Sequence, residues 1–98
     1  MYDSDQGVSQ SDEAALQWYQ KAADQEYDDA QHNLGVMYDT GQGVMQDYVQ
    51  AYKWWVLVAL NGYKEAIINR GLIAAVMSRS QIAEAEKLVQ VWKRKYKN

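Results

Sequence analysis

Few side chains in this sequence of 98 residues could do chemistry. The one histidine, His32, lies close in sequence to Asp28 and Asp29, and a histidine beside two carboxylates can hold a metal ion weakly. The absence of cysteine excludes a thiolate metal site and a cysteine nucleophile, and the single histidine excludes a multi-histidine site. We therefore expect His32 to be a surface or groove residue, and we predict no metal site.

The sequence also lacks side chains at the spacing that a catalytic site needs. No serine has a histidine and a carboxylate arranged for nucleophilic attack, and no pair of carboxylates can be identified for acid–base work. Gly41 and Gly43 lack the lysine and the following serine or threonine of a phosphate-binding loop. Four N-terminal acids are spaced too loosely for a calcium loop: Asp3, Asp5, Asp12 and Glu13. The sequence therefore predicts a protein that is not an enzyme and needs no cofactor.

The composition is that of one small globular domain, with 48% apolar and 23% charged residues. No run approaches the ~20 apolar residues that span a membrane, so no membrane association is expected. The polar start is unlike a secretory signal, and the compartment stays open. The basic run 93–97 could touch phosphates, but the pI near 5.0 argues against nucleic acid as the main partner.

The charges are distributed unevenly along the chain. Residues 1–49 contain ten acidic residues and one lysine, whereas residues 50–98 contain nine basic and three acidic residues. Two interpretations remain open. In the first, the charged residues of both halves are solvated surface residues with no functional role. In the second, an acidic end and a basic end steer head-to-tail contacts or orient a charged partner.

An internal repeat is the main signal in the sequence. Identical residues recur thirty-six positions apart, as in the pairs Trp18/Trp54, Asn33/Asn69 and Gly35/Gly71. A period of this length is typical of a solenoid, in which each unit buries its apolar face against the next.

The apolar residues of each unit have helical spacing. One stripe contains Ala15, Trp18, Tyr19, Ala22 and Ala23, and its equivalent contains Ala51, Trp54, Trp55, Val58 and Ala59. A second helix follows in each unit, near residues 30–38 and 66–74. The connecting turns are predicted at 24–29 and 61–62. We expect Asp28 or Asp29 to cap the second helix and Gly41 to end it in the left-handed conformation. Trp54 and Trp55 are expected in the core.

A C-terminal helix is predicted after residue 77. Ser78 and Gln81 have the spacing of a capping box, in which each side chain bonds the other residue's backbone N–H. An apolar stripe follows at helical spacing and contains Ile82, Ala85, Leu88, Val89 and Trp92. Basic residues then close the helix, as its dipole favours.

These motifs resemble the Sel-1-like repeat, a relative of the tetratricopeptide repeat with a longer turn. The resemblance is carried by A-x-x-W-Y-x-K-A-A at 15–23 and L-G-x-M-Y-x-x-G-x-G-V at 34–44. It implies an all-α fold, an α-solenoid of helix–turn–helix repeats with a C-terminal capping helix. The expected divisions are a remnant of a preceding repeat or a lid at 1–10, repeats at 11–46 and 47–77, and the cap at 78–98. Similar proteins occur in the bacterial envelope and in the cytosol.

The same resemblance implies a protein–protein interaction scaffold that binds a peptide or protein segment on its concave face. The helix with the Leu-Gly motif would line that face in each unit. The groove residues implied in this way are Asp29, His32, Asn33, Val36 and Asp39 from one unit, and Glu65, Ile68, Asn69 and Leu72 from the next.

The start of the repeat pattern suggests an alternative function. The first helix, from about Ser11, would expose the face on which a preceding helix pair would normally pack, unless residues 1–10 form a lid over it. Either the sequence is a fragment of a longer array, or another copy covers that face. The alternative is therefore a self-assembling structural module, a dimer or a head-to-tail stack through the open N-terminal face, with a second copy as partner.

Overall fold

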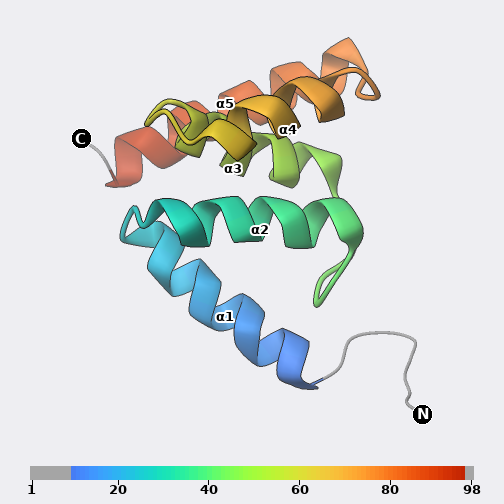
Figure 1. Cartoon of the computed structure of the whole chain (residues 1–98). Helices are drawn as coiled ribbons and strands as arrows, with labels where there is room; N and C mark the ends of the chain where they lie inside the picture. Colours follow the sequence, from blue (N-terminus) through green and yellow to red (C-terminus); the bar gives the residue numbers. More distant parts are fainter. Residues whose placement is uncertain (1–9, 97–98) are drawn as a thin grey trace.

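The computed structural model describes residues 10–96, and these residues form five α-helices. In chain order the helices are α1 (Gln10–Asp24), α2 (Asp28–Thr40), α3 (Tyr48–Ala59), α4 (Lys64–Ala74) and α5 (Arg79–Tyr96). They are stacked from α1 at one end to α4 and α5 at the other (Figure 1). The predicted all-α solenoid is confirmed. The predicted remnant or lid lies outside the described residues, except for Gln10, which begins α1.

The turn between α2 and α3 forms as its glycines predict. Gly41 has a φ of 77° and ends α2, and its N–H donates to the carbonyl of Met37. Gly43 has a φ of 79°, and a Cβ there would lie 2.9 Å from the backbone oxygen of Asp12. Glycine is therefore needed at residue 43 both for the backbone conformation and for the close approach to α1.

The predicted cap of α2 is wrong. The residue before α2 is Tyr27, whose side chain makes no capping bond, and Asp28 and Asp29 lie inside the first turn. Both carboxylates accept hydrogen bonds from the α3–α4 turn, from Asn61 and Tyr63, instead of capping their own helix. Their negative charge still favours the N-terminus of α2.

The cap of α3 was not predicted. The Asp47 carboxylate accepts hydrogen bonds from the backbone N–H groups of Val49 and Gln50, at 3.0 and 3.2 Å. Two of the donors that a helix start leaves unpaired are thereby satisfied.

The predicted capping box of α5 is confirmed. Ser78 Oγ accepts from the backbone N–H of Gln81 at 3.1 Å, and Gln81 Oε1 accepts from the backbone N–H of Ser78 at 2.9 Å. The helix packs mainly on α3, where the rings of Trp92 and Trp54 meet edge to face at 6.0 Å. α5 therefore covers one side of α3.

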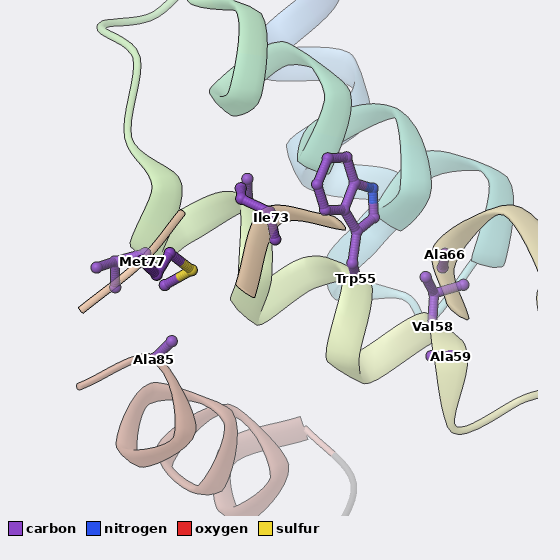
Figure 2. Packing of buried hydrophobic residues seen from close by; sticks show 9 residues of the cluster. Trp55, Val58, Ala59, Ala66, Ile73, Met77 and Ala85 are labelled. Carbon is purple, nitrogen blue, oxygen red and sulfur yellow. The ribbon is translucent and has the colours of Figure 1, made fainter. Parts of the chain in front are cut away.

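The core consists of two clusters that share α3. Trp55 is 3% exposed and points from α3 toward α2, among Val58, Ala66 and Ile73 (Figure 2). Trp54, which is 1% exposed, belongs to the other cluster, with Leu34, Leu57 and Trp92. The core positions predicted for both tryptophans are confirmed.

Trp18 differs from its repeat equivalent. It lies on α1 at the edge of the stack and is 68% exposed, whereas Trp54 is buried between α5 and the α1–α2 unit. In the described part of the chain, no helix covers Trp18 as α5 covers Trp54.

Candidate functional site

All nine residues of the implied groove lie on α2 and α4. Five are on α2 (Asp29, His32, Asn33, Val36 and Asp39), and four are on α4 (Glu65, Ile68, Asn69 and Leu72). Asp29, Glu65, Ile68 and Leu72 are exposed, and the other five are half-buried. Some of these residues line a hollow, and others lie at the junction between the two repeat units.

Three of the nine residues line one hollow. A depression of about 180 Å³ lies where α2, α3 and α4 meet, and Asp39, Asn69 and Leu72 line it. Its other lining residues, which were not predicted, are Tyr48, Trp55, Ile73 and Val76. Carboxylate and amide groups therefore stand beside aromatic and aliphatic walls, which is the usual make-up of a recognition site.

The apolar side of this hollow continues along α4. Ile68, Leu72 and Val76 are 61%, 67% and 66% exposed, and they follow one another at intervals of four residues. Ile68 and Leu72 therefore lie on one face of α4, and Val76, in the turn after α4, lines the hollow together with Leu72. Val76 could have been found in the sequence, because it extends the interval from Ile68 and Leu72.

Two other predicted residues hold the junction between the units. The Tyr63 hydroxyl donates to Asp29 Oδ1 at 2.9 Å, and the His32 ring stacks on the Tyr63 ring at 4.9 Å. The indole N–H of Trp55 also donates to the His32 backbone oxygen at 3.3 Å. Asp29 and His32 thus join α2 to the unit that follows.

The environment of His32 favours its neutral form. Burial lowers the pKa of His32 below its usual value, and the carboxylates of Glu65 and Asp29 oppose part of this shift. Its Nδ1 atom is buried and lacks a hydrogen-bond partner within residues 10–96. Nor do those residues contain a group of three histidine, cysteine or acidic side chains that could hold a metal ion.

A second cavity, not predicted from the sequence, surrounds Lys53. It has a volume of about 230 Å³ and lies between α1, α3 and α5, with Trp54, Trp92 and Tyr96 in its wall. The Lys53 ammonium lies 4.1 Å from the centroid of the Trp54 ring, within reach of a cation–π interaction. Burial lowers the pKa of Lys53 to about 8, with Asp24 opposing the shift.

Among residues 10–96, no helix is both long enough and apolar enough to span a membrane.

The comparisons with known proteins agree with this fold. No curated protein matches the chain. Among solved structures, the chain is similar to c5321, described as a protective antigen present in uropathogenic Escherichia coli strains displaying an SLR fold. The TM-score is 0.82 and the sequence identity 35%, over 87% of this chain. The match spans only 18% of the length of c5321.

The family comparison covers more than half of the chain. The Sel1 repeat matches residues 1–27 and 28–63. The second match contains α2 and α3, the pair that the Trp55 contacts hold together. Sel1 repeats generally act as non-catalytic scaffolds for protein–protein interactions. The chain belongs to the Sel1 repeat family.

Proposed function

We propose that the chain binds a peptide segment along a groove formed by α2 and α4. The observation that carries this proposal is the hollow between Asp39 and Asn69, which continues into the exposed apolar stripe of Ile68, Leu72 and Val76. Exposed aliphatic side chains in a row are costly to hydrate, and a bound segment would remove them from water.

The groove favours a segment with apolar and basic side chains. Asp39 lines the hollow, and Glu65 is an exposed acid on α4, one turn before Ile68 and Asn69. A basic side chain of the segment would be attracted to these acids, while its apolar side chains pack on Leu72 and Val76.

The two asparagines of the groove bind the peptide backbone in this proposal. Asn33 and Asn69 occupy the same position in successive units and are both half-buried. A carboxamide offers both donors and an acceptor, so it can pair with a backbone N–H and a backbone carbonyl. Such pairing would fix the direction of the segment whatever its sequence.

A displayed library of random 12-residue peptides tests the proposal. Selection against the chain is expected to enrich peptides that combine leucine or isoleucine with lysine or arginine. The double variant Asn33→Ala, Asn69→Ala should lose most of the capture of these peptides, while its melting temperature stays close to that of the parent chain. The matched control is Met45→Ala, because Met45 is 88% exposed in the α2–α3 turn and does not line the hollow.

Two results would overturn the groove. Either the selection enriches no such peptides, or the double asparagine variant captures them as well as the Met45 control.

The exposure of Trp18 favours a second candidate function, self-assembly of the chain. A tryptophan exposed at 68% is a large apolar surface in contact with water, and its repeat equivalent is buried by helix packing. Covering this face with a second copy would make the chain a structural module. Light scattering over a concentration series tests this candidate, because a mass that stays at 11.3 kDa would contradict it.

A further inference from the structure

The two repeat units differ in how the second helix of each is covered. On α2, Gln31 and Leu34 are 2% and 0% exposed, and Gly35 lies against the Trp55 ring, because α3 packs over this face. The equivalent residues on α4 are Ile67, Arg70 and Gly71, which we call the α4 seat.

The α4 seat is open. Ile67 is 42% exposed, and a Cβ built on Gly71 would have no neighbour within 4 Å. The open seat follows from the position of α5, which packs mainly on α3 and contributes Trp92 there. Within the described residues, α4 therefore lacks the neighbour that α3 provides for α2.

The helix with the matching pattern is α1. Its residues Ala15, Trp18 and Tyr19 are the repeat equivalents of Ala51, Trp54 and Trp55 on α3. The three residues of α3 are at most 3% exposed, whereas Trp18 is 68% exposed and Ala15 and Tyr19 are half-buried, with Tyr19 partly packed against the Leu34 and Trp54 cluster. A helix that resembles α3, and is not covered as α3 is, thus stands at the opposite end of the molecule (Figure 1).

We propose that α1 of a second copy docks on the α4 seat in the way that α3 docks on α2, with Tyr19 of one copy over Gly71 of the other. This inference rests on the second candidate function and names its contact. The interface continues a packing arrangement that the chain already contains, between α2 and α3.

Charge favours the same pairing. α1 carries Asp12 and Glu13 in its first turn, whereas the seat carries Arg70. These acids of one copy would attract Arg70 of the next. Because the two surfaces differ, the contact is heterologous, and further copies can add to both ends.

Two single variants test the two sides of the contact separately. Gly71→Glu places a charged side chain where the Tyr19 ring would lie, in space that is open in the monomer. Trp18→Glu places a charge on the exposed face of α1. Met45→Glu is the control, since Met45 is exposed and belongs to neither α1 nor α4.

The measurement is the mass in solution by sedimentation equilibrium, up to about 1 mM chain. The parent chain and the Met45 variant are expected to exceed 11.3 kDa as concentration rises, and each of the two test variants should associate roughly tenfold more weakly or not at all. A mixture of the two test variants should form a 1:1 dimer and stop there, because each variant retains the surface that the other has lost.

Three results would overturn the inference: a parent chain that remains monomeric, test variants that associate like the parent, or a mixture that forms no dimer. If only one of the two variants associates like the parent, identical faces are in contact. Gly71 and Trp18 do not line the groove hollow, so peptide capture by the same variants reports on the groove independently.

Discussion

Trp55 lies so close to Gly35 that the residue at position 35 must be glycine for this packing to form. A Cβ built on Gly35 would lie 2.7 Å from ring atoms Cδ1 and Cε2 of Trp55. This contact joins α2 to α3, and it is reinforced by the hydrogen bond from the Trp55 indole to the His32 backbone oxygen. Gly71, the repeat equivalent of Gly35, has no such neighbour.

Alanine at the two glycines should therefore have opposite effects. Gly35→Ala is expected to lower the free energy of unfolding by about 1–3 kcal/mol, because the Trp55 ring must move. Gly71→Ala should raise it by about 0.5–1 kcal/mol, because alanine stabilises a helix interior. Urea unfolding of the two variants under conditions that keep the chain monomeric measures both values. Equal effects would mean that Trp55 does not pack on Gly35.

The two equivalent tryptophans should also differ. Trp54→Ala is expected to cost about 3–5 kcal/mol, because Trp54 is 1% exposed and its removal leaves a cavity beside Trp92. Trp18→Ala should change the stability of the monomer by about 0.5 kcal/mol or less, since most of its ring is exposed. Thermal unfolding of both variants compares them. A large loss of stability for Trp18→Ala would place Trp18 in the core.

The turn between α3 and α4 should depend on the left-handed backbone of Gly62. Its φ is 83°, and the equivalent residue in the other unit, Glu26, also has a positive φ of 68°. Gly62→Ala is expected to cost about 1 kcal/mol, although a Cβ there meets nothing within 4 Å. Gly62→Asn is the control and should cost less, because asparagine tolerates this conformation. If the alanine and asparagine variants have the same stability, backbone conformation is not the cause.

Lys53 should make stability rise with pH above about 8. Its pKa is about 8 in the folded chain and near the usual 10.5 when unfolded, so the unfolded chain binds the proton more tightly. Below pH 8, where Lys53 is protonated in both states, its burial lowers the free energy of unfolding by the full amount. The free energy of unfolding therefore increases from pH 8 toward about 9.5. Tyr38 and Tyr63, whose pKa values are raised above 10.0, limit the window at its upper end. Denaturant unfolding of the parent chain and Lys53→Met measures this, and an identical pH profile for both would exclude Lys53 as the source.

Local patterns in the sequence predicted much of the fold. The repeat spacing predicted the helices, Gly41 predicted the end of α2, and Ser78 with Gln81 predicted the start of α5. Each of these depends on residues close together in the chain. The cap expected at Asp28 or Asp29 was wrong because Asn61 and Tyr63, more than thirty residues away, bind both carboxylates.

The candidate site was less predictable for the same reason. The position of α5 on α3 depends on tertiary packing of Trp92, and this position leaves α4 open. The hollow also includes Tyr48 and Val76, whose roles depend on how three helices meet. Repeat position alone could place Asn69 on the right helix, but it could not separate the hollow from the junction at His32 and Tyr63.

The most direct test of the scaffold function is to map peptide binding residue by residue. A peptide enriched from the random library would be titrated into isotopically labelled chain, and the backbone amide shifts followed by NMR. We expect the largest shifts at Asn33, Asn69, Leu72 and Val76, with smaller shifts around Asp39. Amides near Lys53 serve as the internal control and should not change. Shifts concentrated around Lys53, or saturable binding without shifts on α4, would contradict the proposed groove.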